Sequence, residues 1–261
     1  MLSACLGLTC ACSNDDLQDG AKSLTEKCAP TASLTVTLYG KTYKQVPTAY
    51  TEQGDFVFHN EELAQNFVIY SAIHPDYSVR IVNDNEIEFF DNLNANLASD
   101  SLEFISTQTR STRAIIGPDQ KKTGHVILFD DRHYKDRSLE LGIQNANEEL
   151  KVSHLSTYGF NDKCSSMKIQ NNLPNDPTQT VDLGTNNGVV KCSEAILLFI
   201  GYEDTSYRGK TFTVFANPGA PMRGLDGLSG YNDKMSSCIL SYTRKSAVPE
   251  NAYEPQPIPE P

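Results

Sequence analysis

Two strings in the chain carry oxygen-bearing side chains in the same order. Residues 160–169 are FNDKCSSMKI, and residues 231–240 are YNDKMSSCIL. Each string is an aromatic residue followed by Asn, Asp, Lys, a variable residue and two serines. A hard divalent cation such as Ca2+ takes ~6–8 oxygen ligands from carboxylates, hydroxyls, amides and main-chain carbonyls. Because one short string cannot supply that many oxygens, the repetition predicts two strings that share their ligands around calcium.

Each string closes a longer unit that opens with a hairpin sequence. The first unit opens with LFDDRHYKDRSLEL (128–141) and the second with GYEDTSYRGKTFTV (201–214). Gly209 stands where a folded-over hairpin needs a positive φ, which glycine adopts at little cost. The first hairpin has Asp136 at that position, and Asp tolerates the conformation less well. The units are therefore an internal duplication with one departure in the first copy.

The region around these units has the pattern of an antiparallel β protein. From His125 to Tyr242, short alternating runs such as HVILF, AILLFIGY and TFTVFA are separated by turn residues, and helical periodicity is missing. Alternation with a period of two predicts half-buried strands. We therefore expect a β-sandwich or Greek key in this part of the chain.

The duplicated region resembles the βγ-crystallin domain, in which two Greek-key motifs pack as a β-sandwich. Microbial members carry the calcium signature [Asn/Asp]-[Asn/Asp]-x-x-[Ser/Thr]-Ser once in each motif. NDKCSS and NDKMSS both match it in full, and the two hairpins match the opening of the motif. The resemblance covers roughly residues 124–244, less than half of the chain. The expected fold class is mainly β, with this two-motif sandwich following a small N-terminal α+β domain.

The resemblance implies two Ca2+ sites, each built from both motifs. It assigns a side-chain oxygen to the Asp of each string and a main-chain carbonyl to the Lys. The hydroxyl of the first Ser in each string would reach across to the site of the other motif. Main-chain oxygens of the hairpins complete the shells. The implied ligand residues are Asp130, Asp162, Lys163, Ser165, Glu203, Asp233, Lys234 and Ser236. The residues expected to support the loops are Asn161, Ser166, Asn232 and Ser237.

Two departures from the family pattern bear on whether both sites are intact. One is Asp136, and the other is an insertion between the motifs at residues 171–192. Either would loosen one site. The alternative for both strings is turn chemistry alone, because Asn-Asp and Ser-Ser are common at turns and strand ends. Some members of the family have also lost their affinity for calcium.

The N-terminus has the features of an export signal. Residues 1–12, MLSACLGLTCAC, resemble the end of a secretory signal peptide, and a polar tether follows over residues 13–33. Cys12, followed by Ser-Asn-Asp-Asp, resembles the acidic signal of Bacteroidetes-type surface lipoproteins, and we expect it to be lipidated. Cys5, which ends the lipobox-like LSAC, is the alternative, and an uncleaved apolar terminus is another. The prediction is an exported bacterial outer-membrane or cell-surface lipoprotein that touches the membrane only through its lipid anchor.

Residues 34–105 predict a small α+β domain of unknown function. LTVTLYG (34–40) and DFVFHN (55–60) alternate like strands. Asn60 can cap a helix that begins with two glutamates, which lie favourably at the positive end of the helix dipole. YSVRIVNDNEIEFF (77–90) predicts two strands around a turn.

The remaining segments connect or end these parts. Residues 106–123 are polar and charged and are expected to form an interdomain linker. The Pro-rich segment 245–261 is expected to be a disordered tail.

The cysteines outside the leader do not have the spacing of a zinc site. Cys28, Cys164, Cys192 and Cys238 include no CxxC pair. An exported protein can form disulfides, and four cysteines allow three pairings. Disulfides and buried free thiols are both consistent with the sequence.

Composition narrows the function further. The formal net charge of −11 argues against a nucleic-acid partner and suits a binder of cations. The five histidines lack HxxxH spacing, and GLDGLSG (224–230) lacks the GxSxG order of a hydrolase elbow. We therefore predict a calcium-binding protein that is not an enzyme, in which calcium stabilises the domain. The alternatives are a secreted protease inhibitor or other module that binds an extracellular protein or glycan, and an enzyme whose first region is catalytic.

Overall fold

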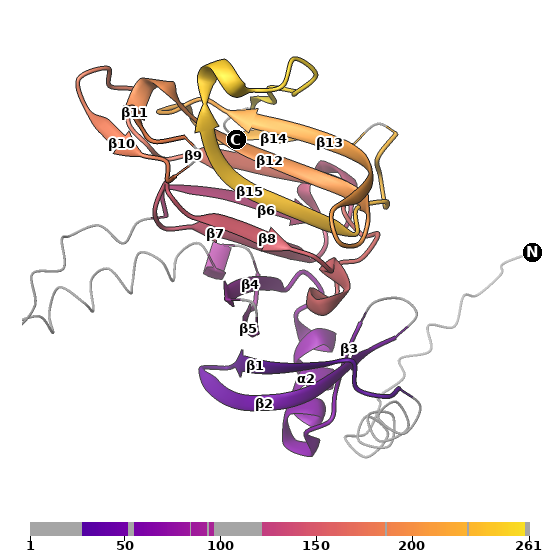
Figure 1. The fold of residues 1–261 in the computed structure, drawn as a ribbon. Helices are drawn as coiled ribbons and strands as arrows, with labels where there is room; N and C mark the ends of the chain where they lie inside the picture. The colour runs from indigo at the N-terminus through magenta and orange to yellow at the C-terminus, as the bar shows by residue number, and fades with distance from the viewer. Residues whose placement is uncertain are drawn as a thin grey trace, which may run out of the picture.

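The structure is a computed structural model that describes residues 28–51, 55–83, 85–92, 94–96, 122–185, 187–228 and 230–258 (Figure 1). The predicted signal with Cys5 and Cys12, most of the tether, and the linker up to residue 121 lie outside the described residues. No helix within the described ranges is long and apolar enough to span a membrane.

Two successive four-stranded motifs form the C-terminal part of the fold. Each hairpin sequence gives the first two strands of a motif, and each Ser-Ser pair leads into the fourth strand. The strands of the first motif are β6 (Gly124–Phe129), β7 (Ser138–Ile143), β8 (Glu149–Val152) and β9 (Ser166–Asn171). Those of the second motif are β12 (Ala195–Asp204), β13 (Arg208–Ala216), β14 (Arg223–Leu225) and β15 (Ser237–Arg244).

The third strand of each motif leaves its own sheet. β14 of the second motif pairs with β9, and β8 of the first motif pairs with β15. One sheet therefore contains β14-β9-β6-β7, and the other has the order β13-β12-β15-β8. Figure 1 shows the second sheet lying over the first. This reciprocal exchange makes two interlocked Greek keys, and it confirms the expected mainly β fold with a two-motif sandwich.

Alternate residues of both sheets fill the space between them. Leu128 of β6 and Leu139 of β7 belong to the same buried cluster as Phe199 of β12 and Leu240 of β15. Burial of such side chains is the main favourable contribution to folding. The core therefore joins the two motifs into one body.

The described N-terminal residues form a small sheet with a helix packed against it. Asn60 Oδ1 accepts a hydrogen bond from Leu63 N at 3.0 Å and caps α2, as expected. Leu63, Phe67 and Tyr70 are buried on one face of α2. The elements are β1 (Ala32–Leu38), β2 (Lys41–Tyr50), β3 (Phe56–Phe58), α2 (Glu61–Ile73), β4 (Ser78–Asn83) and β5 (Glu86–Phe90).

The N-terminal strands continue the first sheet of the sandwich. β4 runs parallel to β7, with Ser78 opposite Ser138 and Arg80 opposite Glu140. The resulting ten-stranded sheet has the order β16-β14-β9-β6-β7-β4-β5-β1-β2-β3. In Figure 1, β4 and β5 lie between β7 and the N-terminal hairpin of β1 and β2. The two regions are thus connected through one sheet.

The expectation of a disordered tail is wrong for residues 245–258. Tyr253 N donates to Thr213 O at 2.9 Å, and Phe215 N donates to Tyr253 O at 3.1 Å. Further on, β16 (Gln256–Pro257) pairs with β14. The physical reason is that β13 and β14 would otherwise present unpaired backbone groups at their edges. The tail follows both edges and pairs with them.

Smaller elements connect the main strands. The insertion forms a separate two-stranded sheet of β10 (Thr180–Asp182) and β11 (Val189–Lys191). Four short 3-10 helices are η1 (Arg132–Tyr134), η2 (Leu155–Tyr158), η3 (Cys192–Glu194) and η4 (Lys245–Ala247).

Candidate metal centre

The two strings meet at one end of the sandwich, where their backbones pair. Asp162 N donates to Met235 O at 3.0 Å, and Asp233 N donates to Cys164 O at 3.1 Å. These bonds join the same positions of the two strings in opposite directions. Asp162 and Asp233 also share a left-handed backbone, with φ of 51° and 52°. The two strings therefore have equivalent conformations related by an approximate twofold axis.

The side chains cross between the motifs. Ser165 Oγ donates to Asp233 Oδ1 at 2.7 Å, and Ser236 Oγ donates to Asp162 Oδ1 at 3.1 Å. Two oxygens that bind one Ca2+ at ~2.3–2.6 Å must lie within about 5 Å of each other. Both pairs meet that condition. The serines are buried, whereas the two aspartates are exposed, so an ion can approach from solvent.

The opening hairpins bring main-chain oxygens to the same places. Ser165 N donates to Phe129 O, and Ser236 N donates to Tyr202 O, both at 2.9 Å. The residues that follow these acceptors are Asp130 and Glu203, so each is held beside the serine of its own motif. Two oxygen-rich clusters result. The Asp233 cluster consists of Asp130, Ser165 and Asp233, and the Asp162 cluster consists of Glu203, Ser236 and Asp162.

The two lysines of the strings lie next to the carboxylates in the chain. Lys163 directly follows Asp162, and Lys234 directly follows Asp233, so each has its main-chain carbonyl beside one cluster. The Lys234 side chain turns away and donates to Gly230 O at 3.1 Å. Lys234 therefore has only its carbonyl to offer to an ion.

The second serine of each string fixes the hairpin to the fourth strand. Ser166 Oγ donates to Asp131 O at 2.6 Å and accepts from Tyr134 N at 3.0 Å. Ser237 Oγ repeats the first bond with Asp204 O at 2.6 Å and the second with the matching tyrosine N–H at 3.0 Å. Each hydroxyl thus donates one hydrogen bond and accepts another inside the protein, and so holds its hairpin against the fourth strand.

The two asparagines support the loops in different ways. Asn232 Oδ1 accepts from Leu228 N at 2.8 Å, which ties the second string to the segment before it. Asn161 Nδ2 donates to Asp162 Oδ2 at 2.7 Å and holds the carboxylate itself. The Asp162 carboxylate therefore has one oxygen on Asn161 and the other on Ser236.

Neither departure from the family pattern distorts the strings. Asp136 has φ of 63°, against 81° at Gly209, and its Oδ1 accepts from Arg137 N at 2.8 Å. This local bond lets an aspartate hold the left-handed conformation. The insertion starts at Asn171, the far end of β9 from Ser166, about 16 Å away at the usual rise per strand residue. The Ser–Asp contact between the motifs is thus formed in both clusters despite these departures.

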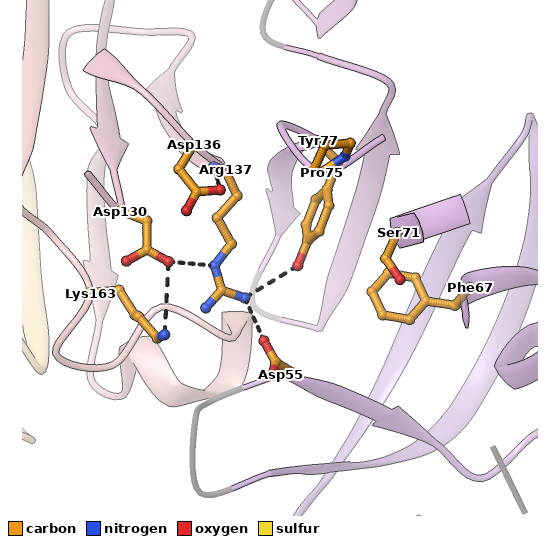
Figure 2. Close-up of a pocket in the computed structure, with 9 residues that line it drawn as sticks. All are labelled: Asp55, Phe67, Ser71, Pro75, Tyr77, Asp130, Asp136, Arg137 and Lys163. Atoms are coloured by element: carbon orange, nitrogen blue, oxygen red, sulfur yellow. Dashed lines mark hydrogen bonds and ion pairs between the residues drawn. The ribbon is translucent and has the colours of Figure 1, made fainter. Parts of the chain in front are cut away.

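A contact between the first hairpin and the N-terminal region was not predicted from the sequence. Arg137 Nε lies 2.8 Å from Asp130 Oδ2, and its Nη1 lies 3.0 Å from Asp55 Oδ1. Nη1 also donates to the Tyr77 hydroxyl at 3.3 Å, and Lys163 Nζ lies 3.8 Å from Asp130 Oδ2. These side chains line a cavity of about 300 Å³ shared by both regions (Figure 2). No spacing in the sequence connects Arg137 with partners 60 and 82 residues earlier.

The charges around this cavity change how one carboxyl titrates. Burial raises the pKa of the Asp130 carboxyl, although the Arg137 guanidinium and the Lys163 ammonium act in the opposite direction. The ionised form of Asp130 thus depends on its cationic partners.

The four cysteines among the described residues are free thiols. Cys164, Cys192 and Cys238 are buried, and Cys28 is partly exposed. Burial raises the pKa of the Cys164 and Cys238 thiols, so both are neutral at physiological pH. Within the described part of the chain, no group of three or more His, Cys, Asp or Glu side chains could hold a metal. Each cluster would therefore bind an ion with one carboxylate, a hydroxyl and main-chain oxygens.

Comparison with known proteins found similar solved structures. No family model and no curated protein matches the chain. A βγ-crystallin from Ciona intestinalis has 23% identity and a TM-score of 0.25, over 44% of this chain and 95% of that one. A double mutant of a βγ-crystallin domain from Clostridium beijerinckii has 19% identity and a TM-score of 0.26, over 45% and 96%. IPSE alpha-1, an IgE-binding crystallin, has 16% identity and a TM-score of 0.28, over 50% and 92%. At these low scores, the fold assignment rests on the exchanged third strands.

Proposed function

We propose that this protein is an exported, surface-anchored calcium-binding protein in which two Ca2+ ions stabilise the sandwich, and that it is not an enzyme. One observation carries the proposal: Ser165 pairs with Asp233 while Ser236 pairs with Asp162. The proposed ligand atoms are carboxylate, hydroxyl and carbonyl oxygens, which suit a hard cation. Export and anchoring rest on the leader with Cys12, or alternatively Cys5.

Calcium would act on stability because its ligands come from both motifs. Each cluster joins residues about 70 positions apart in the chain, so the unfolded chain has no assembled site. A ligand that binds only the folded state stabilises it by RT ln(1 + [Ca]/Kd) for each site. That is about 2.7 kcal/mol per site at a concentration of 100 Kd.

Calorimetric titration and thermal unfolding test the proposal. The wild-type protein should bind two Ca2+ ions, and its Tm should rise between chelator and millimolar calcium. Asp162→Asn and Asp233→Asn should each lose one ion, and the double variant should lose both along with the Tm shift. Glu250→Gln, at an exposed position outside the clusters, is the matched control. An unchanged Tm together with no heat of binding would reject the proposal.

One observation favours a second function, that of a secreted protein-binding module such as a protease inhibitor. The insertion forms its own small sheet, and Val189 on β11 is 63% exposed. An exposed hairpin of this kind can add to the surface of a partner. Complex formation with a panel of proteases, followed by cleavage of residues 171–192 in the free and bound protein, decides it. Unchanged cleavage and no stable complex would exclude this function.

A further inference from the structure

The Asp233 cluster is connected to the N-terminal region through charged side chains. Its member Asp130 is ion-paired with Arg137, and Arg137 is bound in turn to Asp55 and Tyr77 (Figure 2). Asp55 directly precedes β3, and Tyr77 directly precedes β4. The backbone reinforces the connection, because Ser138 N donates to Tyr77 O at 3.2 Å. The first hairpin is therefore held by the N-terminal region at the point where it approaches the cluster.

Asp130 is the residue through which this contact reaches the oxygens. Its N–H donates to Arg137 O at 3.1 Å, and its carboxylate is held by the same arginine at 2.8 Å. Main chain and side chain of Asp130 are thus both held by Arg137. Asp130 directly follows Phe129, whose carbonyl accepts from Ser165 N at 2.9 Å, and the Ser165 hydroxyl donates to Asp233.

The second motif has the same hairpin without this support. Lys210 stands at the position of Arg137, and it is exposed, whereas the Arg137 side chain is 9% exposed. Glu203 stands at the position of Asp130 and makes no ion pair with any residue that the structure describes. The Asp162 cluster therefore lacks an arginine of this kind, and its link to the N-terminal region runs through η2, where Leu155 N donates to Ser236 O at 2.8 Å and Thr157 O accepts from the Tyr50 hydroxyl.

We infer that Arg137 is a positioning residue, and that with Asp55 it makes calcium binding at the Asp233 cluster depend on contact with the N-terminal region. The inference rests on the proposed calcium binding and adds its regulation. The two ions bind with different affinities, and the Arg137–Asp55 contact acts on the one at the Asp233 cluster. Linkage is reciprocal, so binding of that ion should strengthen the contact between the regions by the same factor by which the contact raises the affinity for the ion.

The test uses the full chain and three variants. Asp55→Asn removes the charge from the N-terminal side without touching either cluster. Arg137→Met removes the guanidinium, and Lys210→Met is the matched control in the second motif. In calorimetric titration, Asp55→Asn and Arg137→Met should weaken one Ca2+ site about tenfold and leave the other unchanged, within the usual range of such couplings. Lys210→Met should change neither affinity.

Hydrogen exchange supplies a second readout. Addition of calcium to the wild-type protein should slow exchange of the amides at residues 55–58 and 77–80. Asp233→Asn should lose this protection, and Asp162→Asn should keep it. This difference separates coupling from a general gain in stability, which both variants would share.

The outcomes separate this inference from the proposed function. Two Ca2+ sites that both keep their affinities in Asp55→Asn and Arg137→Met, or that weaken equally, overturn the coupling and leave calcium binding standing. No calcium binding by the wild-type protein overturns both. If Arg137→Met fails to fold, Asp55→Asn decides, because the Asp55 side chain is 56% exposed and its loss leaves Arg137 paired with Asp130 and Tyr77.

Discussion

Single residues set the shape of both hairpins, and the two motifs reach that shape differently. The first hairpin bends at Asp136, and the second bends at Gly209, both with positive φ. The aspartate is supported by its own bond to Arg137 N, whereas a Cβ at Gly209 would lie 2.8 Å from Asp204 Oδ2 and 3.2 Å from Asp204 N. A left-handed residue with a Cβ costs about 1–2 kcal/mol. The second hairpin therefore has a stricter requirement for glycine.

This difference predicts unequal effects at equivalent positions. Gly209→Ala should lower the free energy of unfolding by about 2 kcal/mol, since strain and close contact add. Asp136→Gly should change it by less than about 1 kcal/mol, because relief of strain offsets the lost bond and the added freedom of the unfolded chain. Urea unfolding in chelator measures both effects without a contribution from calcium. Equal losses in the two variants would contradict this account of the hairpins.

The residues of the candidate site show how much of it a sequence can predict. Short oxygen-bearing side chains repeated in one order predicted two strings that share their ligands, and the resemblance to the βγ-crystallin domain implied that each serine reaches across to the other motif. Arg137 could not be found in this way. Its partners Asp55 and Tyr77 come from segments that approach only after the sheet has formed, so no local pattern records the contact.

Whole elements were predicted best where their signals are local. The capping residue and the first-turn glutamates indicated α2 at its observed start, Glu61. The parallel pairing of β4 with β7 has no such signal, because their paired residues lie 60 positions apart. The prediction of a disordered tail was wrong for a related reason. A Pro-rich composition favours disorder, but the sequence does not show that β13 and β14 have open edges for that segment to pair with.

The tail predicts a change in association. Deletion of residues 249–261 should expose the edges of β13 and β14, and open edges pair with other chains. Size-exclusion chromatography with light scattering should show oligomers that increase with protein concentration. Tyr253→Ala, which removes a side chain that is 47% exposed but keeps the backbone bonds, is the control and should remain at the wild-type state. A truncated protein that stays at the wild-type mass would show that the tail does not protect these edges.

The whole molecule depends on a charged junction where its two regions share a sheet. Glu140 on β7 is fully buried, and its Oε1 lies 2.7 Å from Lys122 Nζ and 3.5 Å from His125 Nδ1. Across the β4–β7 pair, Arg80 Nε lies 3.5 Å from Glu140 Oε2. A second link, from the Tyr50 hydroxyl to Thr157 O, joins the N-terminal region to η2. The calcium coupling inferred above requires this junction to stay closed, because Arg137 reaches Asp55 only while β4 is paired with β7.

The pH dependence of stability tests this junction. Burial alone would raise the pKa of the Glu140 carboxyl, but Lys122, His125 and Arg80 together bring that pKa below its ordinary value of 4.5. A carboxyl with a lowered pKa in the folded state contributes stability that is present above pH 4.5, its unfolded value, and is lost as the pH falls through the folded value. Glu140→Gln should therefore lose about 3 kcal/mol of unfolding free energy at pH 7, because it leaves buried cations unpaired.

The difference between wild type and variant isolates Glu140 from the other acids. Urea unfolding in chelator between pH 7 and pH 3 should give a difference in unfolding free energy that is constant down to about pH 4.5 and shrinks below it.

Glu148→Gln is a suitable comparison, since the Glu148 carboxyl also has a lowered pKa but lies exposed at a turn, away from the junction. That variant should lose less at pH 7, and calcium should still protect the amides of residues 55–58 in it. Glu140→Gln should reduce that protection, because opening the junction removes the contact between Arg137 and Asp55. A pH-independent difference, or full protection in Glu140→Gln, would show that Glu140 does not hold the two regions together.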